Sequence, residues 1–322
     1  EKPHRSGWRP LLECEFDLAY TPLMELDYGR GRLMVCTLDL EDHFAQDPAT
    51  RRIAGRILDY ALHAPLSPRV SDVLYLGGEM GSAWLNRIGV SYQKSATLDT
   101  GAGLLLIGPD AAPDAAALNA YLKKGGKAFF LPRTDAEGLL GTTLRPAATN
   151  FAGSLSPPEW PEARGLSASD LRWRSYLETP SWLMSAGAEI GADGLLGRKI
   201  IGKGVAIFCQ VDPDAFHADE KTYFRYTRWR ATRAVAQLLA NLGASFNADN
   251  RIFHPLDTSS TDSDFSVGPN GDRSGPQATG PRNRSATTPN AQPLQPQPFE
   301  SYCPDYRTDF PMGDNPYRYY RW

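Results

Sequence analysis

The sequence predicts an α/β protein with an open, mostly parallel sheet flanked by helices. Three observations predict this fold. Short apolar runs of strand length alternate with amphipathic runs of helix length. Residues 104–107 are apolar at every position, which is typical of a parallel strand that helices cover on both faces. One domain ending also occurs twice along the chain, which indicates a repeated unit.

The repeated ending has a Gly-x-Gly turn, an apolar run that closes on a cysteine, and then an aspartate. Its members are Gly29, Gly31, Cys36 and Asp39 in the first copy and Gly202, Gly204, Cys209 and Asp212 in the second. The offset between the copies is constant at 173. An Ala-Thr-Arg helix start follows each copy at 49–51 and 231–233, so the second connection is nine residues longer.

The repeat predicts one partial and one complete domain. About 28 residues precede the first copy, too few for the strands and helices that precede the second. Residues 1–67 are therefore expected to be the C-terminal part of a first domain, and residues 70–247 a complete second one. The chain is accordingly expected to be a piece of a longer protein.

The complete domain opens with a β-α unit. Residues 73–76 form an apolar strand that two glycines end. Residues 79–88 follow, with Trp84, Leu85 and Ile88 on one helical face. A strand covered by the helix after it is the unit from which parallel sheets are built.

Two further strands and a helix continue the pattern. The strand at 104–107 leads to a helix over 115–124 that Asp114 caps, and Gly125 supplies the left-handed exit. The next strand spans 127–131. Crossovers of this length predict right-handed connections in one sheet.

The periodicity fades between residues 132 and 180, and no elements are assigned there. The sheet resumes with a strand at 205–209, which the glycine turn precedes. A closing helix over 223–242 offers an apolar stripe for packing, and the domain ends near Phe246.

The C-terminal part divides into a linker and a tail. Residues 256–298 are rich in Ser, Thr, Asn, Pro and Gly and cannot bury enough surface to offset their ordering entropy, so they are predicted to be a disordered linker. Residues 299–322 interleave aromatic rings with arginines. Such density predicts an aromatic tail that docks on the protein itself, with a sugar-stacking or nucleic-acid surface as the alternative.

Composition excludes several partner classes. The chain has 34 basic and 37 acidic residues, so no field of one sign draws nucleic acid or an anionic membrane. No apolar run approaches the roughly 18 residues that a membrane span needs. The four cysteines lack metal-site spacing. Cys36 and Cys209 are predicted to be buried, unpaired thiols, and a disulfide of Cys14 or Cys303 stays open.

Both copies place acids and a histidine after the cysteine strand. They are Asp39, Glu41, Asp42 and His43 in the first copy and Asp212, Asp214 and His217 in the second. Carboxylates beside an imidazole suit a divalent metal or acid–base chemistry. The competing interpretation is structural, because an aspartate after a strand satisfies N–H groups of the following turn. Asp39, His43, Asp212, Asp214 and His217 are therefore candidates for a ligand or metal loop, with no metal identity and no cofactor predicted.

Two other kinds of chemistry find less support. Residues 77–81 are glycine-rich at a helix start and could cradle a phosphate, although the pattern also suits a plain turn. Nucleophilic catalysis needs a Cys or Ser on an exposed sharp turn, and residues 132–135 after the strand at 127–131 contain neither. No catalytic residue is predicted.

A carbohydrate surface is a further hypothesis. Exposed aromatic rings stack on sugars, and isolated rings occur in the unassigned region and the tail. The candidates are Trp160, Trp173, Tyr317, Tyr319 and Trp322.

Several segments together resemble the class I glutamine amidotransferase-like domain. They are the Leu-Leu-Leu-Ile-Gly-Pro-Asp run at 104–110, residues 118–131, and the Gly-Lys-Gly run that leads to Phe208, Cys209, Gln210 and Asp212. This version is similar to accessory modules that large bacterial beta-galactosidase-like (family 2-type) glycoside hydrolases carry, sometimes in tandem. The resemblance covers about residues 20–246. The ending at 314–322 also resembles the terminus of secreted polysaccharide-degrading enzymes.

The resemblance implies a flavodoxin-like scaffold that has lost its catalytic elbow cysteine. It implies a non-catalytic structural or oligomerisation module at the C-terminal end of a polysaccharide-degrading glycoside hydrolase, whose active site lies upstream. The implied partners are the rest of the parent polypeptide or a glycosidase subunit, a possible polysaccharide, and a possible second copy of the chain. The implied location is extracellular or periplasmic. The alternatives are a carbohydrate-binding module, or a hydrolase or metal-assisted enzyme that uses Asp212, Asp214 and His217.

Overall fold

A computed structural model describes most of the chain up to residue 247. The described ranges are 2–3, 5–14, 20–28, 30–66, 69–70, 72–135, 139–150, 153–173, 178–183, 187–216 and 224–247. They belong to one compact unit, residues 1–249. The predicted linker and tail lie outside these ranges, as do His217, Cys303 and the tail candidates Tyr317, Tyr319 and Trp322.

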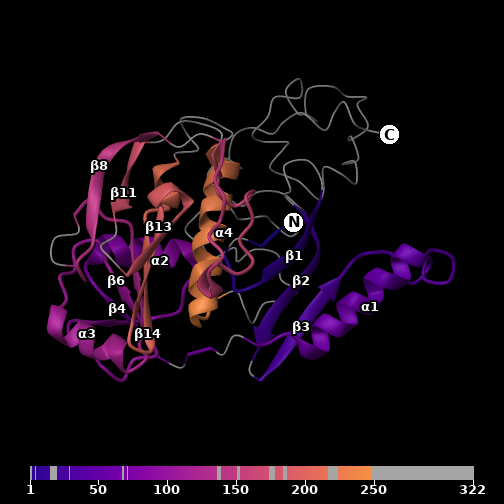
Figure 1. Ribbon diagram of the computed structural model, residues 1–322, viewed down its shortest axis with the longest axis horizontal. Helices are drawn as coiled ribbons and strands as arrows, with labels where there is room; N and C mark the ends of the chain where they lie inside the picture. Colours follow the sequence, from indigo (N-terminus) through magenta and orange to yellow (C-terminus); the bar gives the residue numbers. More distant parts are fainter. Residues whose placement is uncertain are drawn as a thin grey trace, which may run out of the picture. The chain divides into compact units, whose positions relative to one another are not determined.

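The centre of the unit is a seven-stranded mixed sheet (Figure 1). Its strands, in spatial order, are β12 (Ala188–Gly191), β13 (Leu196–Ile201), β14 (Gly204–Cys209), β7 (Lys127–Phe130), β6 (Leu104–Ile107), β4 (Val73–Leu76) and β5 (Gln93–Ser95). The five strands from β14 to β5 are parallel, whereas β12 and β13 are antiparallel. The predicted α/β class with a mostly parallel sheet is therefore confirmed.

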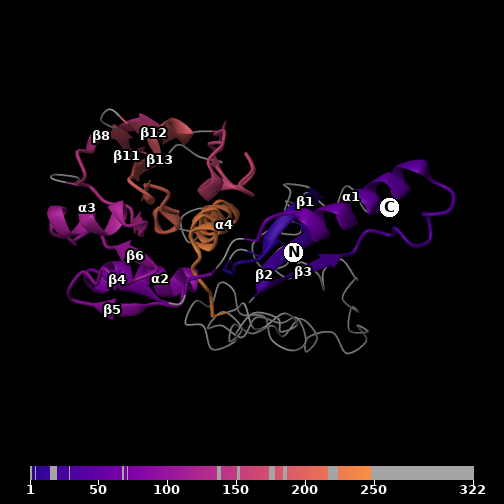
Figure 2. The ribbon, with the colours of Figure 1, turned by 60° about the horizontal axis from the view of Figure 1, so that its bottom comes forward.

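Helices cover both faces of this sheet. They are α2 (Glu79–Ile88), α3 (Ala115–Lys123) and α4 (Phe224–Leu242), seen from two directions in Figures 1 and 2. Leu104, Leu106 and Ile207 pack in one core with α2 and α4. Leu105 and Phe208 point to the opposite face and pack with α3. Burial on both faces explains why these strands are apolar at nearly every position.

Local signals set the helix ends where the sequence predicts them. Asp114 accepts a hydrogen bond from the Ala117 N–H at 2.7 Å and caps α3. Gly89 follows α2 with φ +85°, and Gly125 lies just after α3 with φ +109°. Both adopt the left-handed conformation that glycine takes without strain.

The region without predicted elements contains an antiparallel pair. Strands β8 (Thr143–Asn150) and β11 (Glu178–Leu183) pair with each other, as do the shorter β9 (Gly153–Ser154) and β10 (Arg172–Trp173). Trp182 on β11 packs on Phe208, with ring centroids 4.9 Å apart. This pair therefore covers part of the α3 face of the sheet. Single-turn 3-10 helices lie at Pro161–Ala163, Ala192–Gly194 and Pro213–Ala215.

The N-terminal segment forms its own antiparallel sheet and a helix. Strands β1 (Arg9–Cys14), β2 (Tyr20–Tyr28) and β3 (Gly31–Cys36) are ordered β1-β2-β3, and α1 (Pro48–His63) follows. Arg32 of β3 lies over the Tyr60 ring of α1, with 5.1 Å from its guanidinium carbon to the ring centroid. No helix in the described ranges has the length and apolarity needed to cross a membrane.

The two sheet endings share element order and register. Strands β1-β2-β3 and then α1 match β12-β13-β14 and then α4. Tyr28 pairs with Gly31 and Leu23 with Cys36, just as Ile201 pairs with Gly204 and Leu196 with Cys209, which keeps the offset between the copies. The hydrogen bonds that close the two hairpins, Thr37 N–H to Pro22 O and Gln210 N–H to Leu195 O, keep the same offset.

The two sheet endings differ in how deeply their residues are buried. Cys209 is buried, as predicted, whereas Cys36 is exposed, so the prediction of a buried Cys36 is wrong. Strand β14 pairs with β7 on its second edge and lies between two helical layers. Strand β3 is the outermost strand of its sheet, so its last residue lacks that cover.

A buried polar network joins the N-terminal segment to α4. The Glu25 carboxylate accepts hydrogen bonds from Arg9 Nε at 2.6 Å and from the Tyr60 hydroxyl at 2.9 Å. Arg9 also donates to Asn241 Oδ1 at 3.3 Å, and Arg164 Nη2 donates to the Tyr60 hydroxyl at 2.6 Å. Residues distant in sequence are thereby fixed to one another.

Candidate functional site

The candidate site is the edge of the sheet where the parallel strands reach their carboxyl ends. Ligands of open α/β proteins bind at this edge. The loops after β4, β6, β7 and β14 meet here, because parallel strands end on the same side. They supply Gly78, Asp110, Arg133, Gln210 and Asp212.

The start of α2 is occupied by a carboxylate. The Gly78 N–H donates to Asp110 Oδ1 at 3.0 Å, so Asp110 takes the place that a phosphate would take at this helix start. The Tyr75 hydroxyl donates to Gly78 O at 2.8 Å. Side chains at Gly77, Gly81 or Gly108 would clash with the Tyr75 ring or hydroxyl, which explains these glycines. The glycine-rich run therefore makes room for Tyr75.

Tyr75 predicts a pH dependence of stability. Burial, aided by the Asp110 charge, raises the pKa of Tyr75 from 10.0 to about 12, and burial raises that of Tyr121 to about 12. Between these pH values the unfolded phenols ionise while the folded ones do not, so stability falls as pH rises from 10 to 12. Urea unfolding at pH 9 to 12 measures this fall, and Tyr75→Phe should make it shallower. An unchanged slope in Tyr75→Phe would contradict the assignment.

Arg133 and Gln210 hydrogen-bond to each other in the middle of this edge of the sheet, at the carboxyl ends of the strands. The Arg133 N–H donates to Gln210 Oε1 at 2.9 Å, and Gln210 Nε2 donates back to Arg133 O at 2.8 Å. The Arg133 guanidinium donates to Gly108 O and lies over the Phe130 ring, 5.5 Å from its centroid. We call this set the Arg133–Gln210 clasp. It fills the turn after β7.

The clasp contains a buried cation, the Arg133 guanidinium. Arg133 is 6% exposed, and burial lowers its pKa to about 10, while Asp135 and Asp110 act in the opposite direction. The two carboxylates therefore offset only part of the cost of burying this guanidinium. Arg133 is thus tied by hydrogen bonds to Gln210 and to Gly108 O.

Asp212 and Asp214 both have partners within the fold. Asp212 accepts from Trp84 Nε1 at 2.9 Å and from the Asp214 N–H at 3.0 Å, and burial raises the pKa of its carboxyl. The Asp214 carboxylate accepts from Arg87 Nε at 3.0 Å and lies 3.8 Å from Arg228. Asp212 thus acts as the predicted turn cap.

Replacing Asp212 separates a structural role from a chemical one. Asp212→Ala leaves the Trp84 and Asp214 N–H groups without an acceptor and should cost about 1–3 kcal/mol of unfolding free energy. Asp212→Asn keeps an acceptor and should cost less. Since burial raises the folded pKa, the wild type loses stability as pH rises above 3.8, so the benefit of asparagine grows with pH. Guanidinium unfolding of both variants at pH 4 and 7 measures this, and equal losses would contradict it.

The matching residues of the first copy are arranged differently. His43 Nε2 lies 3.4 Å from Asp39 Oδ2, and both side chains are largely exposed. The cap of α1 is Asp47, which accepts from the Ala49 N–H at 2.9 Å and the Thr50 N–H at 3.2 Å. Within the described ranges, no three His, Cys, Asp or Glu side chains gather as a metal site would require.

The two tryptophan candidates for sugar stacking lie in the core. Trp160 is 8% and Trp173 3% exposed, and the Trp173 ring contacts Phe216 with centroids 5.2 Å apart. Neither ring offers an open face to a sugar. Sequence reasoning missed Tyr75, Asp110, Arg133 and Gln210 as site residues, because their pairing depends on contacts between distant loops.

Comparisons with known proteins give only distant matches. No family model matches the sequence, and neither does any curated protein. Among solved structures, a beta-galactosidase from Rahnella sp. R3 aligns with 14% identity and a TM-score of 0.29, over 51% of this chain and 32% of that one. An exo-beta-1,4-mannosidase from Opitutaceae bacterium strain TAV5 aligns with 14% identity and a TM-score of 0.30, over 57% and 38%.

A third match is a cytoplasmic protein from Salmonella typhimurium, with 12% identity and a TM-score of 0.30, over 51% of this chain and 98% of that one. The chain thus aligns with only about a third of each of the two glycosidases. At these TM-scores and identities the matches carry no inference about this chain's activity.

Proposed function

We propose that the chain is a non-catalytic structural or oligomerisation module of a polysaccharide-degrading glycoside hydrolase, built on a flavodoxin-like, amidotransferase-like scaffold. The observation that supports the non-catalytic role is the Arg133–Gln210 clasp. It occupies the strand ends, where this class of fold binds its ligands. The glycosidase context rests on the sequence resemblance of residues 104–131 and 202–212.

The energetics of the clasp support a structural role. A ligand that entered at the turn after β7 would have to break the reciprocal hydrogen bonds of Arg133 and Gln210 and the bond from Arg133 to Gly108 O. Buried groups that lose such partners each cost about 1–3 kcal/mol. The neighbouring carboxylates Asp212 and Asp214 are used as a cap and as an ion-pair partner.

We also propose a tandem arrangement in the parent protein. Residues 1–67 would be the last part of one domain, and residues 70–247 a complete copy. The shared element order and the constant register offset support this interpretation. The partners of the module are then the rest of the polypeptide and, in an oligomer, its other subunits.

The test measures glycoside hydrolysis by the polypeptide purified from its source. Asp212→Asn and Asp214→Asn should leave kcat and KM unchanged, because neither carboxylate takes part in the reaction. A loss of about 100-fold or more in kcat in either variant would assign acid–base chemistry to this loop and overturn the proposal. A source polypeptide that hydrolyses no glycoside would overturn the glycosidase context.

A further inference from the structure

We propose that the outer edge of β3 is a docking site for a parallel β-strand. The occupant is an α/β segment of the same kind as residues 73–130, carried by the same polypeptide as the missing part of the first domain. This inference rests on the proposed tandem arrangement. The complete copy serves as the template, since both strands next to β14 belong to its own chain.

The direction of the backbone groups defines the docking edge. In β14 the Val205 N–H donates to Gly126 O at 3.2 Å, toward β7, whereas the Gln210 N–H points to Leu195 O on the β13 side. Backbone N–H groups along a strand point alternately to its two neighbours, so the N–H groups of Ile207 and Cys209 also face β7. The constant register makes Met34 and Cys36 their counterparts in β3. Within the described part of the chain, β3 pairs only with β2, so these groups face away from the sheet.

Burial at matched positions points to the same edge. Residues 206–209 of β14 are fully buried, whereas Leu33 and Cys36 of β3 are exposed. An exposed strand edge with apolar side chains is a template for further pairing. The edge of β1 needs no such occupant, because its counterpart β12 is also an outer strand in the complete copy.

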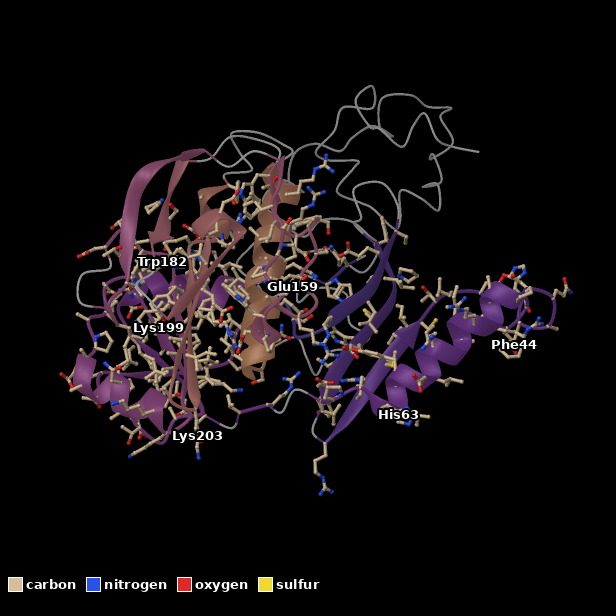
Figure 3. The ribbon with its side chains drawn as sticks, viewed as in Figure 1. Phe44, His63, Glu159, Trp182, Lys199 and Lys203 are labelled. Carbon is tan, nitrogen blue, oxygen red and sulfur yellow. The ribbon has the colours of Figure 1, made fainter. Side chains whose placement is uncertain are left out.

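Helix α1 is also less buried than α4, its counterpart in the complete copy. Ile53 is 43% exposed, while its counterpart Val235 in α4 is fully buried. Leu58 and Leu62 are 64% and 77% exposed. Phe44, which precedes α1, is also exposed, and Figure 3 shows it at the end of the helix away from His63. Several large apolar side chains of α1 and of the segment before it are thus exposed to solvent.

The complete copy also specifies the chemistry of the occupant. Ala128, Phe129 and Phe130 of β7 are buried, and their side chains alternate between the two core layers. The strand on β3 is therefore expected to run parallel to it and to be apolar on both faces. Its own helices would cover Leu33 on one face and complete the packing around α1 on the other.

The test is site-resolved alkylation of cysteines, read by peptide mass spectrometry. Cys36 reports the docking edge, and its counterpart Cys209 is the matched control. In the chain of residues 1–322, Cys36 should react readily and Cys209 should not. In the polypeptide purified from its source, Cys36 should react at least about 100-fold more slowly, because reaction then needs local opening.

Three results would each overturn the proposal. The first is an equal rate of Cys36 alkylation in both samples, and the second is a source polypeptide that begins at Glu1. The third is protection of Cys36 in residues 1–322 as the concentration of that chain rises. The last result would identify a second copy of the chain as the occupant. The hydrolysis test of Asp212 and Asp214 is independent of all three, so either proposal can fail alone.

A variant pair tests the hydrogen-bonding edge itself. Met34→Pro removes an N–H that faces away from β2, so it should leave residues 1–322 folded but restore Cys36 reactivity in the longer polypeptide. Val35→Pro removes an N–H that faces β2 and should disturb the hairpin in both samples. If Met34→Pro does not fold, Leu33→Lys replaces it, because a charge on the covered face opposes docking. Continued Cys36 protection in the folded variant would overturn the proposal.

Discussion

Replacing Glu25 by alanine is expected to lower the free energy of unfolding by about 3–5 kcal/mol. The Glu25 side chain is 1% exposed and accepts hydrogen bonds from Arg9 and Tyr60. Arg32 Nε lies 2.9 Å from its second oxygen. Alanine would take from the nearly buried Arg9 guanidinium the carboxylate that it contacts, whereas Arg32 would keep Asp27, whose Oδ1 lies 3.0 Å from its Nε. An uncompensated buried charge is among the costliest defects in a fold.

Denaturant unfolding of Glu25→Ala measures this loss. Two variants give the scale. Glu25→Gln keeps the shape and one acceptor and should lose less, and Tyr60→Phe removes one hydrogen bond and should cost about 1 kcal/mol. A loss below about 1 kcal/mol for Glu25→Ala would mean that the network adds little to the stability of the N-terminal segment.

The second large effect is a difference in lost unfolding free energy between two matched positions of the repeat. Ile207→Ala is expected to cost about 2–5 kcal/mol, because Ile207 is fully buried between the sheet and its helices. Its counterpart Met34 lies on an outer strand and is only partly buried, so Met34→Ala should cost about 1 kcal/mol or less.

Denaturant unfolding of both variants in residues 1–322 gives the two values. The control is Phe208→Leu, which should give an intermediate loss by shrinking the stacked contact with Phe130. Equal losses at positions 34 and 207 would show that β3 is covered as well as β14 is. That result would contradict the inferred difference in burial between the two endings.

The sequence predicts the strand and helix pattern of the complete copy well, because its signals are local. The strands at Val73–Leu76 and Leu104–Ile107 and the helix at Glu79–Ile88 have the predicted bounds. Glycine exits and the Asp114 cap act within one helical turn. Such signals can be read without knowing the rest of the fold.

Long-range pairing is not predictable in this way. Strands β8 and β11 pair although β9, a 3-10 helix and β10 lie between them in the chain, and neither strand is strongly periodic. Arg133 and Gln210 are 77 residues apart, so the clasp follows only from the strand order. Sequence reasoning found that the turn after β7 lacks a nucleophile, but not that a buried arginine fills it.

The repeat predicts equal backbone structure in both endings but not equal surroundings. Cys36 and Cys209 share their place in the register. Their burial differs because it depends on the strands beyond the hairpin, of which β7 is present for β14 alone. The same dependence makes Trp160 and Trp173 core residues, since isolated aromatics in an aperiodic region give no sign of what covers them.

The most direct measurement of the central claim compares glycoside hydrolysis by two samples. One is the polypeptide purified from its source, and the other is the chain of residues 1–322 alone. We expect the source polypeptide to hydrolyse a glycoside and residues 1–322 to show none of that activity at equal molar concentration. Hydrolysis by residues 1–322 that Asp214→Asn abolishes would contradict the account, because it would place the active site at the strand ends that the clasp fills.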